Sequence, residues 1–435
     1  MRHMDSKPFH MSPQISPMKK TSQKSRVFLV SHNFPPTMGP ESSLVKLNAL
    51  DLLRRGWLVS VMTTTMEHMH QGIDHMMLDS LPANLEILRT PSYDALLRKR
   101  WPRIASMVLT VLHRWILPEI FLLWLFSSVP AGKRWLKKNG PAIIYSRATK
   151  HVSNVTGWFL KRATGLPWVA HMSDPWVEVP YFNPLQRWIA LQFERRIFRD
   201  ADAIVTVSRG LADYILRLHP WARHKVHIIP HGFAPLDKPP APVTGAGSRP
   251  LQALYAGSLT PTLREPDKLF SALVLLNESS PLHLRLQVTF VGDDTIRYQG
   301  LVDSLGLTNI VRLLSPVPYQ TCQDMIDKSD LLLVLDTHGF GGIFLPTKLI
   351  EYLPYAKPVL GLAEPDSTIH KLLKECDLTF ADQDKPVDIA AAFENLLRQW
   401  ETGVWEVSAK SREQTQSYRI DRVNDRLDEL LLRLA

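Results

Sequence analysis

The sequence predicts an α/β protein of two domains, each with a mostly parallel sheet whose strands alternate with helices. Its 435 residues are about twice the length that one hydrophobic core commonly serves. Short apolar and β-branched runs alternate with segments of helical spacing in both halves of the chain. A stretch dense in proline, glycine and small residues, at 237–250, separates the two series and is typical of a linker.

The first series begins with RVFLVS at 26–31, a predicted strand, and continues through a loop and a helix to a second strand at 57–63. Because crossovers between parallel strands are right-handed, this loop is expected at the carboxyl edge of the sheet, where such folds bind ligands. Further strands in this half are expected at 141–146, 166–172, 203–208 and 226–230.

The second series predicts strands at 251–257, 286–292, 309–314, 331–336 and 358–363, and helices near 266–277, 319–328 and 347–355. We therefore expect two Rossmann-like domains that face each other across a ligand-binding cleft. The expected divisions are a disordered tail over 1–25, an N-terminal domain over 26–236, a linker over 237–250, a C-terminal domain over 251–412 and a terminal helix over 413–435 that can pack back on the N-terminal domain.

Composition restricts the class of protein. The two cysteines, Cys322 and Cys376, are too few for a disulfide framework or a cysteine-rich metal site. No Asp-x-Asp signature or other metal-ligand cluster stands out, so we expect neither a metal ion nor another cofactor. The first 25 residues lack the continuous apolar stretch of a secretory signal, which favours a cytoplasmic location.

The net charge of +9 predicts an anionic partner, and much of it lies at 96–138, the basic-aromatic segment. This segment carries nine basic residues and four tryptophans around a single acid, Glu119, which is typical of an insertion that rests on an anionic membrane surface. Its apolar run at 104–128 contains Arg114 and Glu119, which make membrane insertion costly. An ordinary helical insertion packed on the first domain is the alternative. No nucleic-acid partner is expected, because the basic residues accompany no recognised reading module.

The stretch GGIFLPTKLIEYLPYAKPVL at 341–360 predicts an anion-binding loop. Gly341 and Gly342 precede a helix that is expected to start near Thr347, and free N–H groups there would hold a diphosphate. Lys348 adds positive charge, and Glu351, one turn later, can accept hydrogen bonds from ribose hydroxyls. A surface ion pair between Lys348 and Glu351 is the alternative.

The stretch YAGSLTPTLREPDKLFSAL at 255–273 places Gly257 and Ser258 at a strand end and Arg264 and Lys268 near the next helix. Phosphate recognition uses this combination, since glycine lets the backbone approach the oxygens and arginine supplies charge-assisted bonds. A turn with merely solvated basic groups is the alternative. Both stretches follow strands of one domain and can converge on one diphosphate.

In the first domain, HMSDPW places His171 and Asp174 just beyond a predicted strand end, where a carboxylate or imidazole could orient a bound substrate. A buried, hydrogen-bonded histidine is the alternative for His171. His231 and Gly232 end a strand before the linker, and we expect a hinge or a ligand contact there.

Taken in order, HMSDPW, ERRIFRDADAIVTVS, HIIPHGF, YAGSL and LPTKLIEYLPYAKPVL resemble glycosyltransferase family 4, which has the GT-B fold. The resemblance extends from about residue 26 to the end. It implies retaining transfer of a sugar from a nucleotide-diphosphate sugar to an acceptor hydroxyl. It also implies that Gly39 approaches the donor phosphates, that Arg264 and Lys268 bind the diphosphate and that Glu351 binds the ribose.

One departure from the family pattern concerns the donor sugar. The first glutamate of the family's paired-glutamate motif would fall at Ile343, so this chain resembles an LPTK-type variant in which the loop backbone handles the sugar. The missing glutamate keeps open a catalytically silent nucleotide-sugar-binding protein. A sugar-nucleotide 2-epimerase also stays open, because it would use the same two-domain fold and the same diphosphate site. The basic-aromatic segment predicts a lipid-linked or polysaccharide acceptor in cell-surface synthesis, with the protein peripheral on the inner face of the membrane. An inverting enzyme would use Asp174 or His171 as its base.

Overall fold

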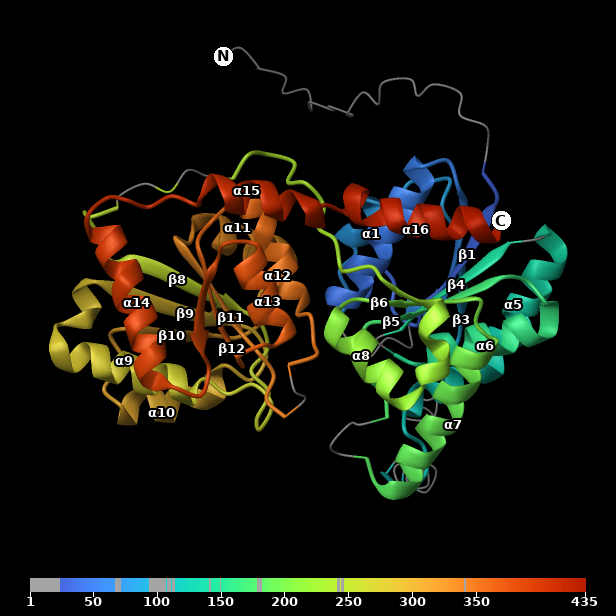
Figure 1. Cartoon of the computed structure of the whole chain (residues 1–435), viewed down its shortest axis with the longest axis horizontal. Coiled ribbons are helices and arrows are strands. Elements are labelled where there is room, and N and C mark those ends of the chain that lie inside the picture. Colours follow the sequence, from blue (N-terminus) through green and yellow to red (C-terminus); the bar gives the residue numbers. More distant parts are fainter. Residues whose placement is uncertain are drawn as a thin grey trace, which may run out of the picture.

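The computed structural model describes residues 24–435, apart from 67–71, 94–106, 108–110, 112–113, 141, 149, 178–181, 241–242, 244–245 and 340–341. Two α/β domains lie side by side, and the terminal helix α16 returns across the top of the N-terminal one (Figure 1). Each domain has a parallel sheet with helices on both faces, as the alternating pattern predicts.

The N-terminal domain has a seven-stranded sheet in the order β3-β2-β1-β4-β5-β6-β7. Its strands are β1 (Arg26–Val30), β2 (Leu58–Thr64), β3 (Glu86–Thr90), β4 (Ile143–Ala148), β5 (Trp168–Met172), β6 (Ala203–Thr206) and β7 (Val226–Ile228). Its helices are α1 (Pro40–Arg54), α2 (Met76–Asp79), α5 (Leu125–Asn139), α6 (Val152–Thr164), α7 (Pro184–Asp200) and α8 (Arg209–Leu218), with 3₁₀ helices at Ile120–Trp124 and Pro220–Lys225.

The C-terminal domain has a six-stranded sheet in the order β10-β9-β8-β11-β12-β13. Its strands are β8 (Leu251–Ala256), β9 (Leu286–Val291), β10 (Val311–Leu314), β11 (Leu331–Leu335), β12 (Val359–Ala363) and β13 (Thr379–Asp382). Its helices are α9 (Asp267–Ser279), α10 (Gln299–Ser304), α11 (Tyr319–Lys328), α12 (Thr347–Tyr352), α13 (Thr368–Glu375) and α14 (Pro386–Glu401); α15 (Ala409–Thr415) and α16 (Ile420–Leu434) follow. Short 3₁₀ helices lie at Leu282–Leu284, Ile296–Tyr298, Leu353–Tyr355 and Gln416–Tyr418.

The strand order of each sheet reverses once, and this reversal positions the site. The chain runs outward from β1 to β3 and then resumes at β4 beside β1; likewise it runs from β8 to β10 and resumes at β11 beside β8. At such a switch point the loops after the two neighbouring strands diverge and leave a crevice at their carboxyl ends. Each domain therefore offers one crevice.

The chain passes between the two domains twice, near Phe233 and near Ile420, and these two connections are hydrogen-bonded to each other. The N–H of Phe233 donates to the carbonyl of Tyr418 at 3.0 Å, and the N–H of Ile420 donates to the carbonyl of Phe233 at 2.8 Å. Gly232 allows this contact, because a Cβ there would lie 2.8 Å from Ile420 Cα. The expected hinge glycine thus lies where the two connections meet.

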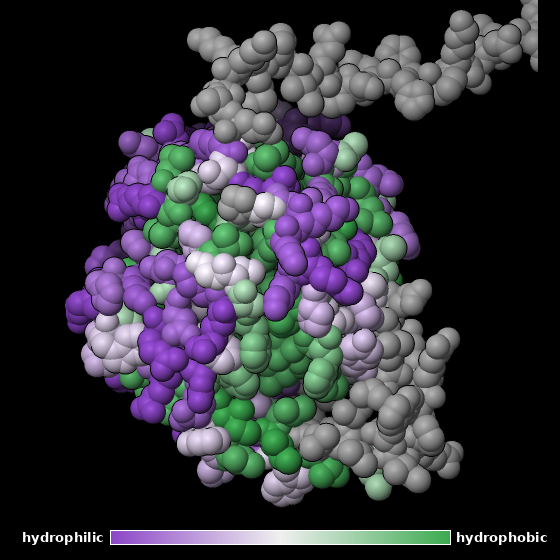
Figure 2. Space-filling model, turned by 90° about the vertical axis from the view of Figure 1, so that its right-hand side faces the viewer, coloured by the Kyte–Doolittle hydropathy of each residue, from purple (hydrophilic) through white to green (hydrophobic). Residues whose placement is uncertain are grey.

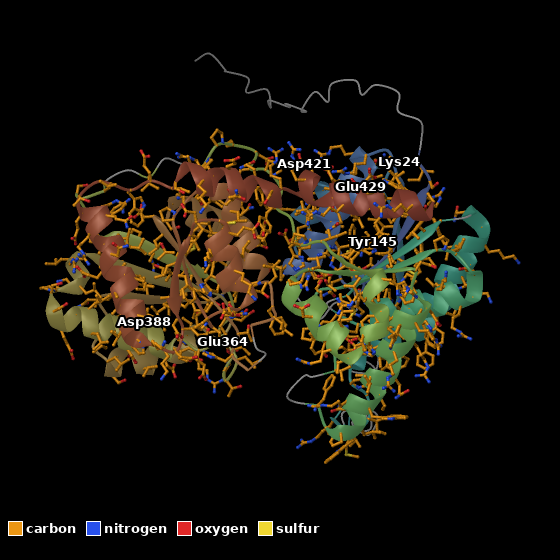
Figure 3. The ribbon with its side chains drawn as sticks, in the orientation of Figure 1. Lys24, Tyr145, Glu364, Asp388, Asp421 and Glu429 are labelled. Carbon is orange, nitrogen blue, oxygen red and sulfur yellow. The ribbon has the colours of Figure 1, made fainter. Side chains whose placement is uncertain are left out.

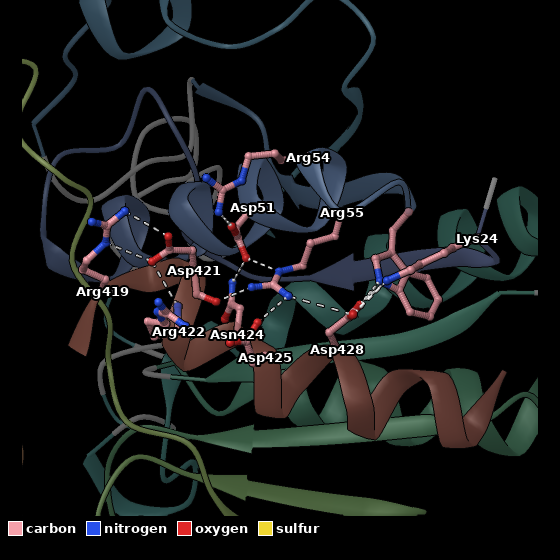
Figure 4. Close-up of polar contacts among 11 residues, drawn as sticks. Lys24, Asp51, Arg54, Arg55, Arg419, Asp421, Arg422, Asn424, Asp425 and Asp428 are labelled. Atoms are coloured by element: carbon pink, nitrogen blue, oxygen red, sulfur yellow. Dashed lines mark hydrogen bonds and ion pairs between the residues drawn. The ribbon is translucent and has the colours of Figure 1, made fainter. Parts of the chain in front are cut away.

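Helix α16 docks on α1 through a buried carboxylate, that of Asp51 (Figure 4). Asp51 Oδ2 accepts from Arg55 Nε at 2.7 Å and from Asn424 Nδ2 at 2.9 Å. Lys24 Nζ and Asp428 Oδ1, 2.7 Å apart, extend the contact toward the start of β1. These bonds fix the terminal helix on the N-terminal domain.

The basic-aromatic segment differs from its prediction in one respect. Residues 94–106 lie outside the described part of the chain, but Trp124 and Trp135 are buried rather than at the surface. Their indole N–H groups donate to Thr90 Oγ1 at 2.8 Å and to Glu86 Oε1 at 2.7 Å, both on β3. These two tryptophans attach α5 to the sheet edge, so the aromatic surface signature holds for Trp115 only among the described tryptophans of this segment.

Candidate functional site

The C-terminal domain gathers predicted phosphate-binding residues where β8 and β11 end side by side. Gly257 and Ser258 directly follow β8, and Arg264 lies in the same loop. Arg264 Nη2 donates to Thr337 Oγ1 at 2.7 Å, and Thr337 lies two residues beyond β11. This bond joins the two loops at the switch point of the sheet, the place where α/β domains bind their ligands.

The charges of Arg264 and Lys348 both act on the same phenol, that of Tyr255. Burial raises the pKa of Tyr255, whereas the charges of Arg264 and Lys348 oppose that shift. Both cations therefore act within electrostatic reach of one hydroxyl, as binding of one diphosphate requires. Lys268 lies exposed in the first turn of α9, and the structure gives it no direct bond to this group.

Helix α12 begins at Thr347, as predicted, and carries Lys348 and Glu351 on one face. Lys348 Nζ lies 2.9 Å from Glu351 Oε2, with side chains that are 34% and 25% exposed. Burial lowers the pKa of Lys348, but the carboxylate of Glu351, together with Tyr352 and Cys322, raises it by more, so that pKa lies above its ordinary value. The two groups form the ion pair that the sequence allowed as an alternative, and both also line the cleft described below.

The loop at 342–346, called the donor loop here, is fixed by contacts at both of its sides. Gly342 has a φ of 62°, and a Cβ there would lie 2.3 Å from the Ser367 Cβ, so only glycine fits. The carbonyl of Ile343 accepts from Ser208 Oγ, in the N-terminal domain, at 2.9 Å. The Ile343 side chain packs against the hydrophobic core, which accounts for an apolar residue where the family has glutamate. Gly341 lies outside the described residues.

The N-terminal crevice contains a buried charged cluster that sequence reasoning missed. Arg147, 2% exposed at the end of β4, places Nε 3.3 Å from Glu41 Oε1 and Nη2 3.1 Å from His231 Nδ1. Glu41 lies in the first turn of α1, two residues after Gly39, whose φ of 116° requires glycine. The sequence did contain a signal for this cluster, the arginine inside the apolar strand IIYSRA. A buried charge needs a charged or polar partner, so this arginine predicts one nearby.

His171 lies inside β5 and not beyond its end, so the predicted position is wrong. Its Nδ1 is 2.8 Å from Tyr145 Oη, and burial, followed by the charges of Arg147 and His231, holds the pKa of His171 well below its ordinary value. It is therefore a neutral, buried histidine, the alternative that the sequence left open. Tyr145 is buried inside the N-terminal domain, whereas Glu364 lies in the C-terminal domain (Figure 3).

Asp174 lies two residues beyond β5 and is partly exposed. Burial of its carboxyl group, and then the charge of Glu41, raise the pKa of Asp174 to about 7, while Lys150 opposes the shift. A carboxyl group that titrates near neutral pH suits acid–base work or control of an acceptor hydroxyl.

The two domains enclose a cleft of about 1180 Å³ beside these crevices. Its N-terminal wall comes from α1 and residues 73–80, its C-terminal wall from α11 and α12, and its floor from the connection at 232–240. It reaches four of the predicted site residues: Gly232, Thr347, Lys348 and Glu351. Within the described ranges, no group of three His, Cys, Asp or Glu side chains could hold a metal ion.

Comparison with known proteins agrees with this architecture. Residues 49–232 match the family model of the glycosyl transferase 4-like domain. A search of the curated proteins finds no significant match. Among solved structures, sucrose-phosphate synthase from Thermosynechococcus elongatus matches with a TM-score of 0.63 and 17% identity, covering 95% of this chain and 99% of that one.

Two further solved structures share the fold over nearly their whole length. HepE of Anabaena, in complex with UDP and glucose, matches with a TM-score of 0.62 and 15% identity, covering 94% of this chain and 99% of that one. WaaG, a glycosyltransferase involved in lipopolysaccharide biosynthesis, matches with a TM-score of 0.59 and 15% identity, covering 93% and 99%. The predicted fold class is confirmed: the chain has the GT-B fold, and the match of residues 49–232 to the glycosyl transferase 4-like domain identifies it as a glycosyltransferase.

Proposed function

We propose that the protein transfers a sugar from a nucleotide-diphosphate sugar to a hydroxyl group of a lipid-linked or polysaccharide intermediate in cell-surface synthesis. The observation that carries the donor class is the bond from Arg264 Nη2 to Thr337 Oγ1, which joins the loops after β8 and β11, together with the charges of Arg264 and Lys348 that both act on Tyr255. A diphosphate there would lie one helical turn from Glu351, whose carboxylate can accept bonds from both ribose hydroxyls.

The reaction breaks the bond between the sugar's anomeric carbon and the diphosphate oxygen and forms a bond to the acceptor oxygen. Negative charge grows on the departing diphosphate, so Arg264, Lys348 and the donor loop lower the barrier when they are already in place. In a retaining reaction, the acceptor proton passes to the departing phosphate and no strong base is needed. We place Asp174 beside the acceptor, where its carboxylate orients the hydroxyl.

The proposed acceptor follows from one surface of the N-terminal domain. Trp115, Leu185 and Trp188 are 58%, 47% and 58% exposed. Asn183 Nδ2 donates to the carbonyls of Arg114 and Trp115 at 3.2 Å, which holds the start of α7 against the basic-aromatic segment. Figure 2, viewed from the side of this domain, shows apolar side chains from the middle of the face to its lower end, with hydrophilic ones beside them.

This surface combines exposed rings with the cations Arg114 and Arg187, which suits the interface of an anionic membrane. Among the described residues, no helix has both the length and the apolar character needed to cross a bilayer. We therefore propose peripheral contact, on the face where a lipid-linked acceptor would be presented.

A donor screen tests the enzyme class. UDP-glucose is the first donor to examine, because HepE was solved with UDP and glucose. Without acceptor, slow release of nucleoside diphosphate supports the transferase, interconversion of the sugar supports an epimerase, and binding without either supports a silent binding protein. Arg264→Ala and Glu351→Ala are each expected to weaken donor binding about tenfold or more, whereas Arg312→Ala, on the exposed face of β10, leaves it unchanged.

Vesicle co-sedimentation tests the acceptor surface. Binding to vesicles with anionic lipid is expected to fall with salt and to be lost in Trp115→Ser/Trp188→Ser. Trp221→Ser, at a tryptophan that is 45% exposed after α8, is the matched control. Equal binding by all variants, or equal binding to neutral vesicles, would remove the support for membrane contact.

A further inference from the structure

A second groove, of about 290 Å³, lies where the two domains and the terminal helix meet. Its walls come from α8 of the N-terminal domain, α13 of the C-terminal domain and the first half of α16. Leu345 of the donor loop forms part of its lining. It shares no lining residue with the larger cleft, so it is a separate feature of the molecule.

The charge of this groove is strongly one-sided. Its cations come from all three walls: Arg209 from α8, Lys371 from α13, and Arg422 and Arg426 from α16. The acidic side chain in the lining is Glu375, which accepts a bond from Tyr418 Oη at 3.3 Å.

Most of this positive charge is left without a counter-ion. Arg209 is paired with Asp213 at 3.0 Å, one turn along α8. Within the described parts of the chain, Lys371, Arg422 and Arg426 have no salt-bridge partner. Cations on different elements that face one narrow groove repel each other, and an anion between them removes that repulsion.

We infer that this groove binds a small phosphorylated molecule and that this ligand regulates transfer. A phosphate group offers three acceptor oxygens and about two negative charges, which match several cations in a confined space. The hydroxyl of Thr368 lies in the same lining and adds a neutral donor. A volume near 290 Å³ suits a small molecule of this kind and is too small for a second nucleotide sugar.

The walls of this groove also contact the donor loop. Through these contacts a bound ligand can affect transfer. Ser208 Oγ donates to the carbonyl of Ile343, and Gly210 brings α8 so close that a Cβ would lie 2.8 Å from Thr368 Oγ1 and 3.1 Å from Ile343 Cα. A ligand that binds α8, α13 and α16 together favours the arrangement in which these contacts are made. It would therefore hold the donor loop against the N-terminal domain.

Calorimetric titration of the full chain with inorganic phosphate and with glycerol 3-phosphate tests the site. Lys371→Gln/Arg426→Gln is expected to weaken binding about tenfold or more. Lys374→Gln/Arg433→Gln removes equal charge from the same two helices outside the groove lining and should change it less than twofold. Equal weakening in both pairs, or no measurable binding to the wild type, would overturn the proposal.

Arg264→Gln separates this site from the donor site. The groove should keep its phosphate affinity in that variant, whereas loss of all phosphate binding would assign the phosphate to the donor site and overturn the proposal. Small-angle scattering tests the regulation. Glycerol 3-phosphate should lower the radius of gyration of the wild type but not of Lys371→Gln/Arg426→Gln, and binding without that change would overturn the regulatory part.

Discussion

Lys348 Nζ lies 2.9 Å from Glu351 Oε2, so the two groups assigned to the phosphate and the ribose of the donor are paired with each other. A donor changes this balance, because its phosphate oxygens attract Lys348 while its ribose hydroxyls donate to Glu351. The pair holds each side chain in a defined position on α12 before the donor arrives, which lowers the entropy lost on binding.

The first prediction is therefore that Lys348 and Glu351 contribute to donor binding in a coupled, non-additive way. Lys348→Ala should weaken nucleoside-diphosphate binding more than about tenfold, because it removes a phosphate cation and leaves the Glu351 charge uncompensated. Glu351→Ala should cost about tenfold, and the double variant less than the sum of the two by about 1 kcal/mol. Calorimetric titration measures all three. The exposed pair Glu429 and Arg433 on α16 provides the control cycle, and additive effects at Lys348 and Glu351 would contradict the shared site.

The second prediction concerns the close contact between Gly232 and Ile420, where the two connections between the domains meet. Gly232→Ala would push a methyl group against the Ile420 backbone, and we expect a loss of about 1–3 kcal/mol in the free energy of unfolding. Gly300→Ala, in α10, has open space around its Cβ and should be neutral or stabilise by about 0.5–1 kcal/mol. Urea unfolding compares the two, and equal effects would show that the crossing tolerates the extra atom.

Much of the fold was predictable because its strands are buried on both faces. The strands β11 and β12 read as continuous apolar runs, and β8 is apolar apart from Gln252, so all three are easily recognised. The edge strands β3 and β13 were missed, since β3 has three partly buried positions and an exposed glutamate, and β13 is only four residues long. Edge strands keep a polar side, so their sequences resemble loops.

Site residues were predictable where they belong to one local sequence motif. They were not predictable where the site forms from segments that are distant along the chain. LPTKLIE identifies Lys348 and Glu351 by itself. The role of Arg147 depends on its contacts with Glu41 and His231, which are 106 and 84 residues away along the chain. A local motif cannot show such contacts. β5 ends at Met172, where the sequence predicts a strand end, so His171 belongs to the predicted strand itself. The sequence did not show its partner, Tyr145, which lies 26 residues earlier on β4.

The third prediction tests the docking of α16. Asp51→Ala removes a buried carboxylate that accepts bonds from Arg55 and Asn424, and it leaves both donors without that partner. We expect a loss of about 2–3 kcal/mol in the free energy of unfolding, reduced by the partial exposure of Arg55. Asp425→Ala, which breaks a pair with the same arginine at a carboxylate that is 54% exposed, should cost less than about 1 kcal/mol. Denaturant unfolding measures the loss of stability in both variants. Equal losses would contradict the claim that the buried carboxylate of Asp51 contributes more than the exposed one of Asp425.

The fourth prediction is a pH dependence of stability that comes from Asp174. Because burial and Glu41 raise the pKa of Asp174 to about 7, the folded protein holds this proton more tightly than the unfolded chain does. The stability contributed by this group is therefore fully present at low pH and is lost as pH rises from about 4 to about 7. Asp174→Asn should flatten this decline. Some slope should remain, because burial also raises the pKa of Glu119 to about 7.

The same titration should appear in catalysis. If the Asp174 carboxylate orients the acceptor hydroxyl, transfer to acceptor should increase as pH rises through about 7, since the ionised form accepts a stronger, charge-assisted hydrogen bond from that hydroxyl. Asp174→Asn should remove the rising limb and lower acceptor-dependent turnover about tenfold or more, with donor affinity unchanged. Asp213→Asn, at a 57% exposed carboxylate on α8, is the control and should keep the wild-type profile. A rising limb that survives in Asp174→Asn would assign it to another group and take Asp174 out of the acceptor site.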